Sequence, residues 1–154
     1  MPIFDSMKKI IISFVCSLFI CGCASNQIKQ SKATFTPVDR VFAFQVKKEN
    51  TTSKIIVTRD WWLFGDKCYI SFWIDDKLSA RLGIEEKAQF YVEPGYRKIT
   101  VRGDPLNPNS CMEPVYKDVV VNAHINPNET LYYRIFFDET GYSKAGIRPS
   151  NENN

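Results

Sequence analysis

The chain has 154 residues, of which 44% are hydrophobic and 24% are charged, as in an ordinary globular protein with one domain. The net charge of +3 is small and the basic residues are spread along the chain, so no nucleic-acid-binding stripe is expected. Aromatic residues make up 14%, and the 8 prolines and 7 glycines are scattered. This mixture favours many short strands over long helices.

The first segment has the pattern of a secretory signal. Lys8 and Lys9 precede an apolar run at residues 10–20, and small residues follow at 21–23. The run is shorter than the ~20 apolar residues that a transmembrane helix needs. We therefore expect residues 1–22 to be a cleaved signal, with a translation start at Met7 as compatible with the pattern as one at Met1.

The end of this signal resembles the lipobox of bacterial lipoproteins. Ile20 stands three residues before Cys23 and the small Gly22 just before it. The resemblance implies that Cys23 receives a diacylglycerol thioether and that the new N-terminus is acylated, for example with palmitate, which would anchor the chain durably. Because Ala24 and not aspartate follows, it also implies the outer membrane, with the domain facing the periplasm. A plain signal peptide with an incidental cysteine is the alternative.

Two cysteines remain after cleavage and lipidation, Cys68 and Cys111. An even number in an oxidising compartment predicts one disulfide between them, although two unrelated buried thiols are the alternative. A metal site is not expected, because these cysteines and the single His124 offer no closely spaced ligand pair. No cofactor is expected either.

The mature chain divides into three parts. Residues 23–37 are polar after the lipidated cysteine and show no clear period, so we expect a flexible tether that spans up to roughly 45 Å. Residues 38–149 are expected to form one domain, and residues 150–154 a disordered tail.

The domain is expected to be all-β, an antiparallel β-sandwich of about 7–9 short strands, because short apolar runs alternate with turn signals. In the third run the period of two places Cys68, Ile70, Phe72 and Ile74 on one face. The expected strands cover residues 41–46, 54–59, 68–74, 78–82, 88–92, 96–102, 116–123, 130–137 and 142–148.

The stretch at residues 69–101 resembles the repeat of PEGA-type domains and of related small envelope lipoproteins. The resemblance lies in the hairpin turn Asp75-Asp76 and in a pattern carried by Phe90, Val92, Pro94, Gly95, Ile99 and Val101. Where these repeats often have glycine, this chain has Asp76, and aspartate tolerates left-handed turn geometry. The resemblance implies an envelope module without catalysis.

Little in the sequence indicates chemistry. His124 stands alone beside an Asn-Pro turn, and no nucleophile motif accompanies it. Asp75 and Asp76 are adjacent, so in an extended chain they would point to opposite faces and make poor acid-base partners. We therefore expect no catalytic residues and no enzyme, with an envelope hydrolase kept only as a reservation.

An aromatic cluster at residues 59–64 is the candidate partner-binding site. Its residues are Arg59, Trp61, Trp62 and Phe64, beside the turn signal at Gly65. These rings would either fold over one end of the sandwich as packing residues or form an exposed anchor for a protein or a glycan. Contact with the membrane interface is a weaker third interpretation, because acidic residues flank the cluster.

The sequence thus predicts a lipid-anchored, non-enzymatic interaction module of the bacterial envelope. Its partner would be an unknown envelope protein or a cell-wall glycan, and no nucleic acid. The alternative is an inhibitor or immunity-type lipoprotein that blocks a hydrolase with the loop at residues 103–114, stapled through Cys68 and Cys111.

Overall fold

The computed structural model describes residues 27–62, 68–107, 118–137 and 145–152, and these residues form an all-β fold of nine strands in two sheets. The expected fold class is thereby confirmed. One short 3-10 helix, η2 (Val38–Arg40), lies among the strands. The strands are β1 (Thr34–Phe35), β2 (Ser53–Arg59), β3 (Ile70–Ile74), β4 (Lys77–Leu82), β5 (Glu86–Val92), β6 (Gly95–Arg102), β7 (Val119–Ile125), β8 (Thr130–Phe137) and β9 (Ala145–Ser150).

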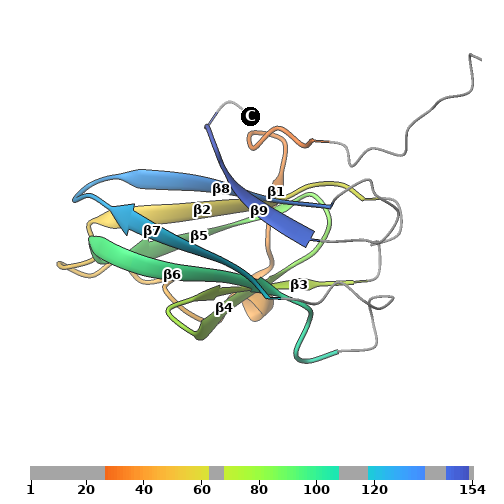
Figure 1. Ribbon diagram of the computed structural model, residues 1–154, viewed down its shortest axis with the longest axis horizontal. Helices are drawn as coiled ribbons and strands as arrows, with labels where there is room; N and C mark the ends of the chain where they lie inside the picture. Colours follow the sequence, from red (N-terminus) through yellow and green to blue (C-terminus); the bar gives the residue numbers. More distant parts are fainter. Residues whose placement is uncertain (1–26, 63–67, 108–117, 138–144, 153–154) are drawn as a thin grey trace, which may run out of the picture.

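The sheets differ in strand direction (Figure 1). The four-stranded sheet, in the order β4-β3-β6-β7, is antiparallel throughout. The five-stranded sheet, in the order β1-β5-β2-β8-β9, is mixed, since β1 is parallel to β5 and β2 is parallel to β8. The expectation of purely antiparallel pairing is therefore wrong. Parallel strands need a long crossover, and here β3 to β7 separate β2 from β8 along the chain.

Alternation located most strands well. The expected strand at 130–137 has the bounds of β8, and those at 54–59, 78–82, 88–92 and 96–102 lie within β2, β4, β5 and β6. In β5 the buried Ala88, Phe90 and Val92 alternate with partly exposed residues. This is the period of a strand with one face in the core.

Side chains from both sheets contribute to one hydrophobic core. The ring of Phe72 on β3 stacks on that of Phe90 on β5, with centroids 5.4 Å apart. Cys68, Ile70 and Ile74 are buried with Phe72, which confirms the predicted buried face of this run. Each large apolar side chain removed from water in this way contributes about 1.5–3 kcal/mol before the entropic costs of folding.

The hairpin between β3 and β4 turns on two aspartates in the left-handed region. Asp75 has φ 49° and Asp76 has φ 60°. A two-residue hairpin turn of type I′ requires a positive φ at both of its central residues. The carboxylate of Asp75 accepts a hydrogen bond from the backbone N–H of Lys98 on β6, at 2.9 Å. The expected turn is confirmed, and its first aspartate also fixes the neighbouring strand.

An edge strap, which we define as residues 29–46, ties the two sheets together at their adjacent edges. Thr34 and Phe35 pair with β5, while the backbone N–H of Phe42 donates to the carbonyl oxygen of Ser79 on β4 at 2.9 Å. The strap returns to β5 where Phe44 accepts a hydrogen bond from the Tyr91 N–H at 2.8 Å. The strap thereby occupies backbone groups that an open sheet edge would expose.

The edge strap corrects two expectations. No strand forms at residues 41–46, where Val41 makes only an isolated bridge to Ala80, because the left-handed φ of 60° at Phe44 breaks extended geometry. The expected tether at residues 23–37 is wrong in its second half, because Gln30, Ala33 and Thr36 are buried against the domain. The folded part therefore includes residues from 29 onward, ahead of the expected start at residue 38, and β9 extends it to Ser150.

Candidate functional site

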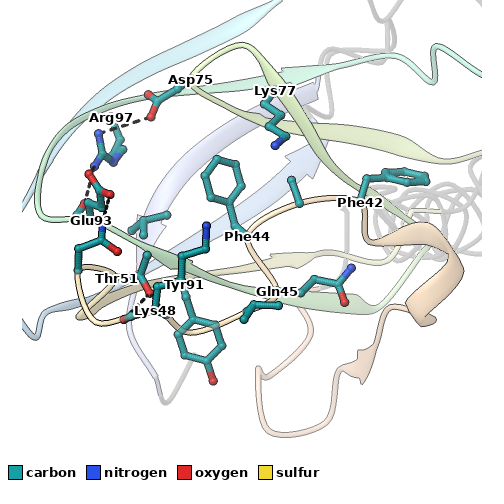
Figure 2. Close-up of a pocket in the computed structure, with 14 residues that line it drawn as sticks. Phe42, Phe44, Gln45, Lys48, Thr51, Asp75, Lys77, Tyr91, Glu93 and Arg97 are labelled. Carbon is teal, nitrogen blue, oxygen red and sulfur yellow. Dashed lines mark hydrogen bonds and ion pairs between the residues drawn. The ribbon is translucent and has the colours of Figure 1, made fainter.

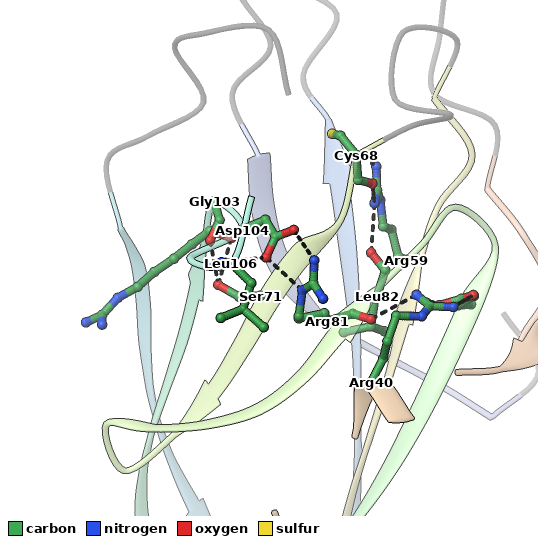
Figure 3. A network of polar contacts seen from close by, with 11 residues as sticks. Arg40, Arg59, Cys68, Ser71, Arg81, Leu82, Gly103, Asp104 and Leu106 are labelled. Carbon is green, nitrogen blue, oxygen red and sulfur yellow. Dashed lines mark hydrogen bonds and ion pairs between the residues drawn. The ribbon is translucent and has the colours of Figure 1, made fainter. Parts of the chain in front are cut away.

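Arg59, expected at the partner-binding surface, lies inside the domain instead. It is 0% exposed, and its Nη1 donates to the carbonyl oxygens of Cys68 at 2.5 Å and of Leu82 at 2.8 Å (Figure 3). These bonds satisfy carbonyl groups of two chain segments that would otherwise be buried and unpaired. Arg59 is therefore a structural residue, and its expected role as a surface contact is wrong.

The tryptophans of the aromatic cluster are both partly buried. The ring of Trp62 stacks on Phe137 with centroids 4.6 Å apart and an interplanar angle of 10°, and it packs against the core. This arrangement fits the packing interpretation for Trp62. Phe64 lies outside the described residues, so a partner contact through Trp61 or Phe64 stays a prediction.

Of the two cysteines that we expected to form a disulfide, the described residues include Cys68 and not Cys111. Cys68 is buried beside Arg59 and is a disulfide-bonded cysteine, but the described residues do not include its partner. Cys111 lies outside the described residues, as does most of the loop at 103–114, so the pairing of Cys68 with Cys111 stays a prediction. Cys23 and the signal at residues 1–22 also lie outside them, so lipidation stays a prediction as well.

A charged network surrounds Tyr69 at the edge of β4. The guanidinium groups of Arg40 and Arg81 lie 4.3 Å and 4.8 Å from the centroid of the Tyr69 ring. Arg40 pairs with Glu86, and Arg81 makes a bidentate pair with the buried Asp104 at 2.7 and 2.5 Å. The hydrogen bond from Arg81 to Asp104 raises the pKa of the Arg81 guanidinium. Because both cations are already paired with carboxylates, the network serves structure and offers no open anion site.

A candidate binding site is a groove of about 700 Å³ beside the second half of the edge strap (Figure 2). Its walls come from the strap and the loop after it, from the turn before β4, and from the ends of β5 and β6. Its volume lies within the range of about 300–1,000 Å³ that small-molecule sites occupy. The aromatic side chains of its wall are Phe42, Phe44 and Tyr91.

Phe44 occupies a strained position in this groove. Its φ of 60° is an outlier for a bulky residue, and its ring packs against the core from the groove side. The carbonyl oxygen of Phe44 holds the strap to Tyr91, so the strap fixes the backbone in this conformation. Strain of this kind costs of order 1–3 kcal/mol and clusters at functional sites.

The charges of the groove fall into two groups. Arg97 is held by Asp75 at 3.5 Å and by Glu93 at 4.0 Å, so its charge is compensated. Lys48 and Lys77 also line the groove, and neither forms an ion pair with a carboxylate of the described residues. The ammonium of Lys77 lies 5.7 Å from the centroid of the Phe44 ring. The groove thus combines an aromatic wall with two uncompensated positive charges.

The groove was missed in the sequence because its residues come from four separate segments. Its one local signal was Phe42 and Phe44, two rings at a spacing of two, which we interpreted as strand residues. These two rings lie beside Lys77 and Tyr91 only in the folded chain.

His124, which stands without a nucleophile motif in the sequence, lies on β7 with its ring 4.8 Å from that of Tyr96 in an edge-on contact. Within the described ranges no group of three potential metal ligands occurs. No helix in that same part of the chain is long and apolar enough to cross a membrane.

Comparison with known proteins found no relative: no family model matches the chain, and no curated protein or solved structure is significantly similar to it. The resemblances to bacterial lipoproteins and to PEGA-type domains therefore stay predictions.

Proposed function

We propose that the chain is a lipid-anchored, non-enzymatic interaction module of the bacterial cell envelope, held through Cys23 at the outer membrane and facing the periplasm. Its binding site is the groove beside the edge strap, and its partner is an envelope protein or a cell-wall component. The single observation that carries the binding role is the groove itself, an open hollow of about 700 Å³ with an aromatic wall.

The make-up of the groove fits binding better than turnover. Phe42 is 43% exposed at the rim and offers a flat apolar contact. Lys48 and Lys77 supply positive charge without carboxylate partners among the described residues, so a ligand with negative groups would gain electrostatic complementarity. No pair of groups within the groove has the arrangement of a nucleophile with its base.

The proposal includes the arrangement of the sheets. We infer that they pack face to face as a sandwich, which agrees with the stacking of Phe72 on Phe90 and with a core drawn from both sheets. The edge strap would then close one side of the sandwich and form the groove at its end.

Variant-dependent capture tests the binding role. The full-length protein would be crosslinked in its host membrane, purified after gentle solubilisation, and compared with a Phe42→Ala, Lys77→Ala variant. A Tyr96→Ala variant is the matched control, because Tyr96 is an exposed aromatic residue that does not line the groove. We expect a partner that is kept by the control and lost by the groove variant.

Two other results would count against the groove. A partner kept by the groove variant but lost by Trp61→Ala would return the binding role to the aromatic cluster. If no protein is captured, titration of the purified protein with soluble peptidoglycan fragments tests the cell-wall alternative. Failure of these fragments to shift the NMR signals of the groove residues would refute the binding role of the groove.

Lipidation is tested separately. Mass spectrometry of the mature N-terminal peptide should show a diacylglycerol and an acyl group on the residue at position 23. A Cys23→Ser variant should lose both groups and keep its signal segment uncleaved.

A further inference from the structure

The edge strap begins a short distance after the proposed lipid anchor. The carbonyl oxygen of Lys29 already accepts from the N–H groups of Lys32 and Ala33 at 2.8 and 3.1 Å. Fully extended, the chain from Cys23 to Lys29 spans only about 20 Å. The first half of the strap must therefore lie close to the membrane that holds Cys23.

In the first half of the strap every third residue is buried, and the residues between are exposed. Gln30, Ala33 and Thr36 are buried against the domain, and the exposed residues between them include two large apolar side chains. Phe35 is 67% exposed and Val38 is 77% exposed. Exposed apolar residues gathered on one short segment mark an interaction surface.

Lysine side chains gather on this face, with the exposed Asp39 and Glu152 at its margin. Lys29 and Lys32 are exposed, and no acidic residue occurs between residues 24 and 38. The ammonium of Lys87 lies 4.7 Å from the centroid of the Phe35 ring and donates to the carbonyl oxygen of Gln30 at 2.9 Å. Each basic side chain near an anionic membrane surface strengthens binding about fivefold.

We propose that this basal face, made of Lys29, Lys32, Phe35 and Val38, rests on an anionic phospholipid surface. The inference depends on the proposed anchoring at Cys23 and extends it, because the lipid alone would leave the orientation of the domain open. The apolar pair enters the interface between headgroups and acyl chains while the lysines contact phosphates, a combination that holds interfacial segments at membranes. The groove, formed by the second half of the strap, is then presented beside the membrane surface.

Site-directed spin labelling tests the basal face. The lipidated protein would carry a nitroxide on Val38→Cys and, as a matched control, on Val120→Cys, since Val120 is an apolar residue of β7 that is 47% exposed. Each would be reconstituted in vesicles of phosphatidylcholine with or without phosphatidylglycerol. Collisions with oxygen, which concentrates in the bilayer, and with a water-soluble nickel chelate report the depth of the label.

In anionic vesicles we expect the label at position 38 to lose nickel accessibility and gain oxygen accessibility, while the label at position 120 does neither. A Lys29→Glu, Lys32→Glu background should return position 38 to the behaviour of the control. A water-accessible position 38 in protein whose lipid is confirmed by mass spectrometry would overturn the basal face alone. Protein that carries no lipid at Cys23 would overturn the anchor and the basal face together.

Discussion

A buried ion pair between Asp60 and Arg134 joins β2 to β8 and offers the most direct test of the structure. The two side chains are 1% and 3% exposed, and Nη2 of Arg134 contacts the Asp60 carboxylate. The Nε and Nη1 groups of Arg134 are buried without a hydrogen-bond partner in the described chain. Removing Arg134 therefore takes away the side-chain hydrogen-bond partner of the buried Asp60 carboxyl and leaves the backbone of Ile28 and the charge of Arg148 as its favourable neighbours.

The expected cost follows from that burial. Breaking a buried pair from one side costs about 3–5 kcal/mol, a large part of the stability of a small domain. With a urea m-value of about 2 kcal/mol/M, a loss of about 4 kcal/mol lowers the unfolding midpoint by about 2 M. We expect this loss for Arg134→Met alone, whereas Asp60→Asn, which resembles the protonated carboxyl that burial favours, should cost less.

A double-mutant cycle in urea, on a soluble chain that begins at Ala24, measures the coupling. Because the Asp60→Asn, Arg134→Met double variant leaves no buried charge behind, it should cost less than Arg134→Met alone. A cost of Arg134→Met below about 1 kcal/mol that simply adds to the cost of Asp60→Asn would refute the reasoning, because it would mean that water screens the pair.

The pH dependence of stability gives a second measurement on the same pair. Burial raises the pKa of the Asp60 carboxyl above its ordinary value of 3.8, against the opposing hydrogen bond and charge of Arg134. The folded state therefore holds this proton more tightly than the unfolded chain. The resulting stabilisation is fully present below pH 3.8 and is lost as the pH rises through the folded pKa. In Asp60→Asn this part of the pH profile should disappear, and an unchanged profile would contradict the assignment.

Three further predictions concern the core, a close contact and the disulfide. Phe72→Ala should cost about 3–5 kcal/mol in urea unfolding, because the ring is fully buried against Phe90, and a cost under about 1 kcal/mol would contradict the shared core. Gly146→Ala would place a methyl group 2.4 Å from the Cζ atom of Phe136, so it should destabilise by about 1–3 kcal/mol but be tolerated in a Phe136→Ala background. Peptide mapping without reductant should recover Cys68 joined to Cys111, and recovery of a free thiol at either position would refute the pairing.

The sequence predicted strands best where one face is buried and turns bound the run. The alternation of Ala88, Phe90 and Val92 with polar residues fixed both the strand and its buried face. The segment at residues 41–46 has the same alternation, yet the strap must bend there to leave β4 and return to β5. Tertiary hydrogen bonds at Phe42 and Phe44 outweigh the local preference for an extended chain, and sequence patterns do not register them.

The site was less accessible to prediction than the fold. Arg59 looked like a surface residue because charged side chains are rarely fully buried, but two carbonyl groups and the Phe137 ring accommodate it. The groove depends on Lys77 and Tyr91 meeting the strap, which is a product of strand register across two sheets. Register of this kind is set by long-range pairing and not by any local motif.

The parallel pairing of β2 with β8 also has a consequence for how the chain acquires its structure. The centre of the five-stranded sheet brings together residues as far apart as Asp60 and Arg134, which are separated by 74 positions in the chain. Closing such a long loop lowers the chain entropy before the stabilising contact has formed. We therefore expect folding to be slower than that of a protein built mainly of hairpins. A chain whose central strands meet only after β8 has emerged completes its five-stranded sheet late in its synthesis. For the exported lipoprotein proposed above, that delay would keep the sheet open until the chain has passed the export channel.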